Sequence, residues 1–376
     1  MKKSSKIRVL EAIRQGQIGG GESHVLELVK RLDRTRFDPT VLSFTDGPMV
    51  DRLKLLKIPC HIIPSNRPFD IRCWTKIKSF LIRENFDLVH VHGTRAASNL
   101  LWATKSCKIP ILYTIHGWSF HDNQSTALRR LRLMSEQYLT SKMDLNISVS
   151  ESNQHRGKNL LRKFDSIVVN NGIDLEKFNP VQNYPDIREE LNIPRNGILI
   201  SFIARMTVQK DPLRLITAFK KVSETCENAH LLMVGEGELK KEAEDLVSRL
   251  DIQERVKFQN FRQDIPSILK ASNIYCLPSL WEGLPIGLLE AMAMNAAVVA
   301  TNVDGSNEII KHNQNGLLVS TDSLDDLSTT LISLCVNTEK RNSLRIEGRQ
   351  SVINNYNILR MVPRIESIYE EVFIKH

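Results

Sequence analysis

Two glutamates eight residues apart, Glu282 and Glu290, stand in the run LPSLWEGLPIGLLEAMAMNAAVVATNVDG and are the side chains best suited to chemistry. The flanking runs SNIYCLPS and AAVVATNV predict buried strands, and Pro285 predicts the start of a helix between them. Glu282 is therefore expected on the strand-to-helix loop and Glu290 inside the helix. Gly283 and Leu284 are expected to offer backbone N–H groups to an anion at the helix N-terminus. Carboxylates so placed can accept hydrogen bonds from sugar hydroxyls or a ribose diol, although a helix acid that only complements the dipole is an equal alternative.

Arg205 and Lys210 form a second candidate pair. They follow the apolar run ILISFIAR and precede a helical segment. Ligands of parallel α/β sheets bind beyond the carboxyl ends of the strands, where such a loop would lie. A guanidinium fork and an ammonium five residues apart can clamp a diphosphate. A solvated loop is the simpler alternative, and the spacing alone favours it.

A glycine-rich segment, GQIGGGES at 16–23, separates the first predicted strand from the first predicted helix. Gly20 and Gly21 allow the backbone to approach a ligand closely. The segment fits a phosphate or sugar cradle as well as it fits a flexible turn. Its spacing is not GxGxxG, so the dinucleotide-binding fingerprint is absent.

Histidines follow two of the predicted strands. His116 comes after ILYTI and before a glycine, and His92 directly follows DLVHV, so both imidazoles are expected at the ligand-binding end of the strands. His90 is expected to point to the opposite face by strand alternation. Most histidines are structural or solvated, but a histidine that precedes glycine at the end of a strand is a better candidate than most.

Length and composition predict two globular domains. The chain has 376 residues, of which 41% are hydrophobic and 25% charged, and suits two domains of roughly 150–200 residues. Its six cysteines are scattered without a CxxC pair, which argues against a zinc site or a disulfide framework. No signal-peptide core and no run of 18 apolar residues occurs, so a cytosolic location is expected.

The order of apolar runs predicts an α/β fold. Runs such as IRVLEAI, DLVHVHG and ILYTIHG alternate with helix-period segments in the first half, and ILISFIAR, HLLMVGEG and IYCLPS do so in the second. Strands that alternate with helices imply parallel, doubly wound sheets. We expect two Rossmann-like domains facing each other across a cleft, with the polar stretch 178–197 as the linker.

Charge is unevenly distributed between the two halves. Residues 1–180 hold 29 Lys+Arg against 17 Asp+Glu, whereas residues 181–376 hold 22 against 26. The segment 125–142 adds a basic amphipathic pattern, in which Leu128, Leu131, Met134 and Leu139 lie among Arg129, Arg130 and Arg132. Such a segment either lies on an anionic bilayer or packs on its own domain with a charged outer face.

The order and spacing of these motifs resemble the family-4 glycosyltransferases, which are retaining enzymes of GT-B fold. The resemblance covers nearly the whole chain. It rests on GGGE near residue 20, TIHG around residue 116, SVSE at 148–151, NNGID at 170–174, ARMTVQK at 204–210, VGEGEL at 234–239, EGLPIGLLE at 282–290 and NQNGLLV at 313–319. We expect residues 1–180 to form the acceptor-side domain, residues 181–360 the nucleotide-sugar domain, and residues 361–376 a helix that returns to the first domain.

The resemblance implies roles for the residues of the second half. Glu290 would bind the nucleotide ribose, and Glu282 the hydroxyls of the donor sugar, assisted by the backbone amides of the two residues that follow it. Arg205 and Lys210 would hold the diphosphate and neutralise its charge as the sugar–phosphate bond breaks. The family pattern usually has glycine at Ala204 and often after the lysine, where this chain has an aspartate, but neither change removes a charge that the chemistry needs.

In the first half, the resemblance implies that Gly20 and Gly21 approach the phosphate and the acceptor. His116 would meet the donor sugar near the reacting carbon, and Glu22 and His92 would lie near the acceptor. The sequence offers no DxD-type metal pair in a suitable loop. Neither a metal ion nor another cofactor is expected, and the leaving phosphate would take the proton of the acceptor in a front-face reaction.

The expected function is transfer of a sugar from a nucleotide sugar, with a UDP-sugar favoured, to a glycan acceptor with retention of configuration. The basic first half favours a lipid-linked acceptor, a role in surface polysaccharide or lipopolysaccharide synthesis, and a peripheral position on the inner face of the cytoplasmic membrane. A soluble small-molecule acceptor and a sugar-nucleotide epimerase of the same fold remain alternatives. A dehydrogenase lacks its glycine fingerprint here, and a nucleic-acid-binding protein would leave the acidic second half without a role.

Overall fold

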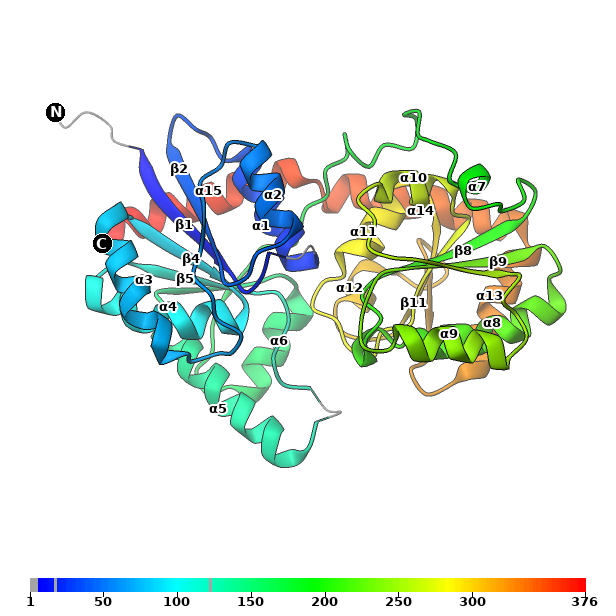
Figure 1. Ribbon diagram of the computed structural model, residues 1–376, viewed down its shortest axis with the longest axis horizontal. Helices are drawn as coiled ribbons and strands as arrows, with labels where there is room; N and C mark the ends of the chain where they lie inside the picture. Colours follow the sequence, from blue (N-terminus) through cyan, green and yellow to red (C-terminus); the bar gives the residue numbers. More distant parts are fainter. Residues whose placement is uncertain (1–5, 17–18, 122–123) are drawn as a thin grey trace. The chain divides into compact units, whose positions relative to one another are not determined.

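Each half of the chain forms its own parallel β-sheet, as the computed structural model shows for residues 6–16, 19–121 and 124–376 (Figure 1). The first unit comprises residues 1–172 and 358–376, and the second comprises residues 173–357. The chain therefore leaves the first unit eight residues before the expected boundary at 180, and it returns three residues before the expected 361.

The first unit holds a seven-stranded sheet in the order β3-β2-β1-β4-β5-β6-β7, in which every pairing is parallel. Its strands are β1 (Ile7–Ile13), β2 (Phe37–Ser43), β3 (Cys60–Ile62), β4 (Leu88–His92), β5 (Ile111–Ile115), β6 (Leu145–Ser148) and β7 (Ile167–Val168). Its helices are α1 (Gly20–Arg31), α2 (Pro48–Leu55), α3 (Ile71–Glu84), α4 (Gly93–Cys107), α5 (Thr126–Lys142), α6 (Glu151–Leu160) and α15 (Ile358–Lys375). The order reverses between β1 and β4, which creates the switch point where such sheets bind ligands.

Alternate residues of these strands face two different helix layers. Val9 and Leu112 pack with α1 and α15, whereas Leu10 and Tyr113 pack with α3, α4 and α5. The C-terminal helix α15, red in Figure 1, thus completes one face of the first sheet. Because both faces are covered, the strands are apolar nearly throughout, as parallel strands usually are.

The second unit holds a six-stranded parallel sheet in the order β10-β9-β8-β11-β12-β13. Its strands are β8 (Ile198–Ile203), β9 (Ala229–Val234), β10 (Val256–Gln259), β11 (Ile274–Leu277), β12 (Ala297–Thr301) and β13 (Leu317–Val319). Its helices are α7 (Ile187–Glu190), a 3₁₀ turn η1 (Val208–Lys210), α8 (Pro212–Thr225), α9 (Lys240–Arg249), α10 (Ile265–Ala271), α11 (Ile286–Ala293), α12 (Ser306–Ile309), α13 (Leu324–Val336) and α14 (Thr338–Asn355). Helices α8, α9 and α13 cover one face, and α7 and α10 pack against the other.

The prediction that residues 178–197 form a linker is wrong. Phe178, Ile187 and Ile193 are buried, and the latter two belong to an apolar cluster of the second unit. The Arg188 guanidinium donates to the carbonyl of Ala271 at 2.9 Å and fixes the segment further. Polar composition and prolines suggested a linker, but three well-spaced apolar residues anchor the segment to the core.

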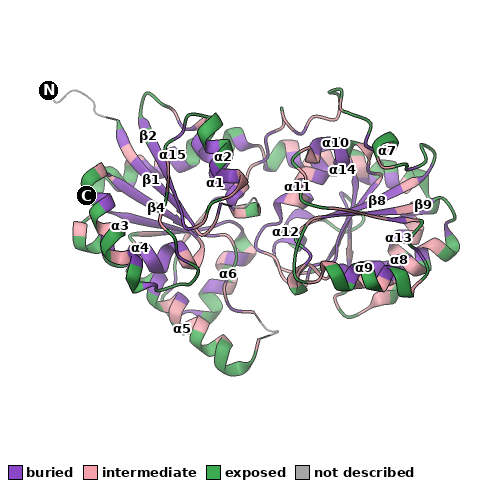
Figure 2. Cartoon of the chain, in the orientation of Figure 1, coloured by how far each residue is buried: buried purple, intermediate pink, exposed green. Residues whose placement is uncertain are grey.

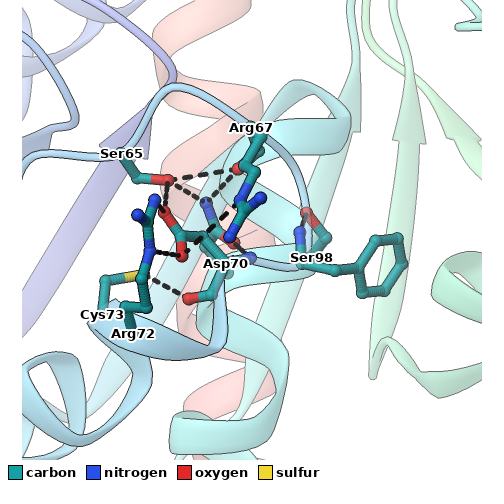
Figure 3. Close-up of polar contacts among 8 residues, drawn as sticks. Ser65, Arg67, Asp70, Arg72, Cys73 and Ser98 are labelled. Carbon is teal, nitrogen blue, oxygen red and sulfur yellow. Dashed lines mark hydrogen bonds and ion pairs between the residues drawn. The ribbon is translucent and has the colours of Figure 1, made fainter.

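A buried aspartate holds the loop between β3 and α3. The Asp70 carboxylate accepts two hydrogen bonds of 2.7 Å from Arg72 and one of 3.1 Å from Ser65, and the Asp70 carbonyl faces the Cys73 thiol (Figure 3). The adjacent backbone N–H of Phe69 donates to Ser98. The Asp70 carboxylate and the Ser65 hydroxyl bond to residues of the same loop and of the start of α3, so we assign the cluster to the folding of the loop.

All six cysteines are free thiols. Among the residues that the structure describes, no helix has both the length and the apolar character that crossing a bilayer requires.

Candidate functional site

The loop after β8, which carries Arg205 and Lys210, contacts the loop after β11. Arg205 is exposed directly beyond the end of its strand, and Lys210 ends η1. The Lys210 ammonium forms an ion pair with the Glu282 carboxylate, and both side chains are largely buried, at 16% and 6% exposure. The structure therefore brings together two predicted site residues that are 72 positions apart in the sequence.

Gln209 ties these two loops together. Its side chain donates to the carbonyl of Trp281 at 2.8 Å, and its own carbonyl accepts the backbone N–H of Leu280 at 2.8 Å. The Lys210–Glu282 ion pair therefore lies beside a hydrogen-bonded bridge between the loops. No sequence pattern singles out Gln209, because a glutamine on a loop is ordinary.

Glycines in the loop after β9 allow it to cross close to the loop after β8. Gly235 and Gly237 have φ values of +141° and +158°. A Cβ at Gly235 would lie 2.1 Å from the Ala204 carbonyl oxygen, and one at Gly237 would lie 2.2 Å from that of Met206. Both positions require glycine, because a side chain would be both strained and in collision with backbone.

Asp211 explains how this chain departs from the family pattern after the lysine. Its φ is +46°, a left-handed conformation that glycine adopts freely and that aspartate tolerates better than most residues. The Asp211 carboxylate accepts a hydrogen bond from the backbone N–H of Arg214 and so caps α8. The substitution keeps the turn and adds a helix cap.

Glu290 and Glu282 lie close to one buried tyrosine. Glu290 is half-buried in the second turn of α11, and Glu282 lies on the loop before that helix, as the sequence predicted. The pKa of Tyr275 is raised well above its usual value, first by burial and then by the charges of Glu290 and Glu282. Gly283 and Leu284 are both buried beside these groups, and anion binding by their amides stays a prediction.

In the first unit, ionisable side chains on and directly after neighbouring strands form a buried cluster. His92 Nε2 lies 2.8 Å from Glu11 Oε2, and His92 Nδ1 lies 2.9 Å from His116 Nε2. His90 Nδ1 and the Tyr369 hydroxyl lie 2.6 Å apart, and Tyr369 also donates to Glu11. The cluster joins β1, β4, β5 and α15.

The prediction that His90 faces away from His92 is wrong. Their ring centroids lie 4.2 Å apart, and both histidines contact Glu11. Adjacent residues of a strand point to opposite faces, whereas residues two apart share a face, so His90 and His92 must point the same way.

Burial disfavours the charged form of three histidines of this cluster. It is the main cause that lowers the pKa of His24 to about 3 and that of His92 to about 4, and it lowers the pKa of His116 well below its usual value. Burial would raise the pKa of Glu11, but His90 and His92 outweigh it and hold that pKa well below its usual range. Glu11 is therefore an ionised carboxylate, which accepts from the Tyr369 hydroxyl and contacts His92.

Sequence reasoning missed Glu11, although a signal for it was present. Glu11 is the one acid within the strand IRVLEAI and is fully buried. A charge inside an otherwise apolar parallel strand requires a partner, and that partner had to come from another strand end. Two groups of donor atoms in the cluster, His24–His92–His116 and Glu11–His90–His92, each lie within 4.8 Å of one another, which is close enough to hold a metal ion, although hydrogen bonds already use several of these atoms.

The glycine-rich segment begins α1 next to His116. Residues 17 and 18 of the predicted segment lie outside the described residues. Gly20 is the first residue of the helix, and a Cβ on Gly21 would lie 3.4 Å from the His116 ring. Glu22 is 4% exposed and lies 3.7 Å from Arg14. The structure thus places Gly21 beside His116, which in turn contacts His92. The binding roles of these residues stay predictions.

The buried histidines predict that the first unit is destabilised by mild acid. A folded-state pKa below the unfolded value of about 6.5 means that the unfolded chain binds more protons as the pH falls below 6.5. His24 and His92 should each remove about 1 kcal/mol of unfolding free energy per pH unit between pH 6.5 and their folded pKa values of about 3 and 4. Urea unfolding at pH 7, 6 and 5 measures this slope. His24→Leu should make it shallower, and a slope that is the same in the variant would contradict the assignment.

Comparisons with known proteins agree with this arrangement. Residues 18–177 match the family model described as Glycosyltransferase Family 4, and residues 183–351 match Glycosyl transferases group 1. The chain is 25% identical to UDP-Gal:alpha-D-GlcNAc-diphosphoundecaprenol alpha-1,3-galactosyltransferase of Escherichia coli, with 98% of each chain covered. It is 26% identical to the phosphatidyl-myo-inositol mannosyltransferase of Mycolicibacterium smegmatis, with 94% of this chain and 90% of that protein covered.

Among solved structures, the fold matches Anabaena Alr3699/HepE in complex with UDP and glucose. The TM-score is 0.86 at 21% identity, with 97% of this chain and 100% of that chain covered. Two parallel α/β units, two adjoining family models that together span most of the chain, and relatives aligned over nearly their full lengths lead to one assignment. The chain belongs to the family-4 glycosyltransferases and has the GT-B fold.

Proposed function

We propose that this glycosyltransferase moves a sugar from a UDP-sugar to a lipid-linked glycan with retention of configuration. The observation that carries the proposal is the pair of loops in the second unit, where Lys210 and Glu282 form an ion pair beyond the strand ends. Arg205 lies on the same loop as Lys210. Positive charge fixed there stabilises a diphosphate leaving group, and a carboxylate beside it can accept hydrogen bonds from sugar hydroxyls.

The proposed donor is supported by the relatives. The E. coli relative is named for UDP-Gal, and Anabaena HepE was solved with UDP and glucose. Glu290, on the second turn of α11, is proposed to bind the ribose of the nucleotide. Arg205 and Lys210 are proposed to supply the positive charge that a divalent cation supplies in other transferases, so that transfer should not require added metal.

The proposed acceptor is supported by charge and by the names of two relatives. The E. coli relative acts on a sugar linked to diphosphoundecaprenol, and the mycobacterial relative on phosphatidyl-myo-inositol. Residues 1–180 of this chain hold 29 Lys+Arg against 17 Asp+Glu, a balance that favours an anionic lipid or surface. The product would extend a surface polysaccharide or a lipopolysaccharide.

The test supplies candidate UDP-sugars with polyprenyl-diphosphate-linked sugars, with and without a chelator, and examines the product by NMR. We expect transfer to the lipid-linked acceptor, a glycosidic bond of the same anomeric configuration as the donor, and no loss of rate with the chelator. An inverted product contradicts retention. Transfer only to soluble sugars or small hydroxy acids contradicts the lipid-linked acceptor and leaves the donor assignment intact.

Helix α5 is the proposed membrane contact. Leu131, Met134 and Tyr138 are 64%, 63% and 50% exposed at helical spacing, next to the exposed Arg130 (Figure 2). Leu139, which was expected on this apolar stripe, is fully buried, and Arg132 donates to the Ser119 carbonyl. An exposed apolar stripe flanked by cations suits the boundary of an anionic bilayer.

Replacing Arg130, Leu131 and Met134 together by glutamine should therefore abolish binding to anionic vesicles. Each cation near such a surface contributes on the order of 1 kcal/mol, and salt should weaken binding of the unchanged protein. Sedimentation with vesicles at low and moderate salt is the measurement. The matched control, Ile82→Gln with Arg83→Gln on the exposed side of α3, should still sediment. Equal loss of binding in both variants would assign the attraction to net charge and reject α5.

A further inference from the structure

In the first unit, Glu11, His92 and His116 form a series of hydrogen bonds, and the partners of each group determine which atom donates. Glu11 on β1, His92 at the end of β4 and His116 after β5 are joined by contacts of 2.8 and 2.9 Å. β1 and β4 are paired neighbours, as are β4 and β5, so the three side chains emerge side by side from one sheet edge. Each contact holds one proton, and the question is which atom carries it.

Glu11 also contacts Tyr369 and His90, which form a second branch of hydrogen bonds. In this branch Glu11 acts only as an acceptor. The Tyr369 hydroxyl lies against Glu11 and against His90 Nδ1, and His90 Nε2 lies 2.7 Å from the Thr114 hydroxyl. A hydroxyl donates once, so Tyr369 donates to the carboxylate and accepts from His90 Nδ1–H. His90 Nε2 is paired with the Thr114 hydroxyl, so both nitrogens of His90 have partners.

On the branch toward His116, the same reasoning places each proton. Because Glu11 only accepts, His92 must carry its proton on Nε2, and neutral His92 then has a lone pair on Nδ1. The proton between His92 Nδ1 and His116 Nε2 must therefore belong to His116. Neutral His116 is left with an unprotonated Nδ1, and this buried atom has no hydrogen-bond partner among the described residues.

His24 does not satisfy that atom. Its ring lies edge-on to His116 with centroids 5.0 Å apart, and neither of its nitrogens meets hydrogen-bond geometry with a described residue. Asn171 lies close enough to His24 to raise its pKa slightly but also falls outside that geometry. A buried acceptor without a donor is costly, and such an atom calls for a ligand or a water molecule.

We infer that Glu11 and His92 are positioning residues that fix the tautomer of His116, so that its Nδ1 accepts a hydrogen bond from a hydroxyl of the donor sugar. This inference rests on the proposed function, because the hydroxyl belongs to the sugar nucleotide. A lone pair at this place also suits the reaction. It does not oppose the positive charge that develops on the sugar, whereas an imidazolium would.

The direct test is the tautomeric state of His116 in the protein without substrate. Long-range ¹H–¹⁵N correlation spectra of protein labelled with ¹⁵N-histidine distinguish a protonated from an unprotonated ring nitrogen, and His116→Gln identifies the signals. We expect unprotonated Nδ1 atoms in both His116 and His92. A proton on Nδ1 of His116 at neutral pH overturns the inference, whatever the activity of the protein.

Glu11→Gln tests whether the carboxylate sets the direction. An amide can donate as well as accept, so the hydrogen bonds from residue 11 through His92 to His116 no longer have one fixed donor–acceptor direction. The His116 spectrum should then show a proton on Nδ1, or a mixture of the two tautomers. We expect kcat for UDP-sugar turnover to fall roughly tenfold to hundredfold, with little change in affinity for UDP itself. Unchanged spectra together with unchanged kcat would also overturn the inference.

Tyr369→Phe is the matched control. It removes a hydroxyl that donates to the same carboxylate but lies on the other branch. The protein should lose stability, yet keep the His116 tautomer and a kcat within about twofold of the unchanged protein. If the unchanged protein releases no nucleotide from any sugar donor while the spectra are as expected, the proposed function fails and the proton assignment stands.

Discussion

Replacing Arg205 or Lys210 by alanine is expected to lower the turnover of the sugar nucleotide by a factor of roughly 10² to 10³. Each residue is proposed to face the diphosphate as negative charge grows on the leaving group, and removal of one such contact in a water-poor site typically costs about 2.7–4 kcal/mol. Both side chains lie on the loop after β8, outside the apolar core of the second unit. Steady-state kinetics of nucleotide release, together with the urea midpoint of each variant, measures the effect and excludes unfolding.

Two controls make this prediction specific. Lys241→Ala removes an exposed lysine of α9 in the same unit and should leave kinetics unchanged. Lys210→Ala also leaves Glu282 without its ion-pair partner, so the double variant Lys210→Ala/Glu282→Ala separates the loss of the cation from the uncompensated carboxylate. If Arg205→Ala and Lys210→Ala both keep the turnover of the unchanged protein, the diphosphate is not bound at this loop.

Glu290→Ala and Glu282→Ala should affect different steps. Glu290 is proposed to bind the ribose, a contact that ground and transition states share, so its loss should weaken binding of free UDP roughly tenfold to hundredfold. Glu282 is proposed to bind the sugar, so its loss should lower kcat with UDP-sugar and leave the affinity for bare UDP nearly unchanged. Calorimetry with UDP and kinetics with UDP-sugar provide the two readouts.

The exposed Glu242 of α9 offers a matched control for both glutamates, and its change to alanine should alter neither readout. Equal losses of UDP affinity in the Glu290 and Glu282 variants would contradict the division of roles. Such equal losses would instead indicate that the Lys210–Glu282 ion pair shapes the nucleotide site as a whole.

The strands and their order of appearance were predictable because parallel strands covered on both faces are continuous apolar runs. The loop after β8 and the helix after β11 were likewise predictable, since Pro285 and the strand ends restrict where Arg205, Glu282 and Glu290 lie. Contacts between residues that lie far apart in the sequence were not predictable. Nothing in a single sequence shows that Gln209 bridges two loops or that Tyr369 reaches Glu11 from the last helix.

Two local errors have clear physical causes. The face of His90 follows from the two-residue period of a strand, and applying that period consistently would have placed it beside His92. The composition of segment 178–197 predicts a linker, but Ile187 and Ile193 are fully or nearly fully buried and anchor the segment to the second unit. For this segment, burial of a few side chains determined the structure, and average polarity did not.

Release of nucleotide from a panel of UDP- and GDP-linked sugars tests the central claim most directly. In the absence of an acceptor, the unchanged protein should slowly release UDP from one UDP-sugar. The Arg205→Ala and Lys210→Ala variants, at equal protein concentration, should release it roughly 10² to 10³ times more slowly. No release from any UDP-sugar, or release that both variants retain in full, would contradict the account.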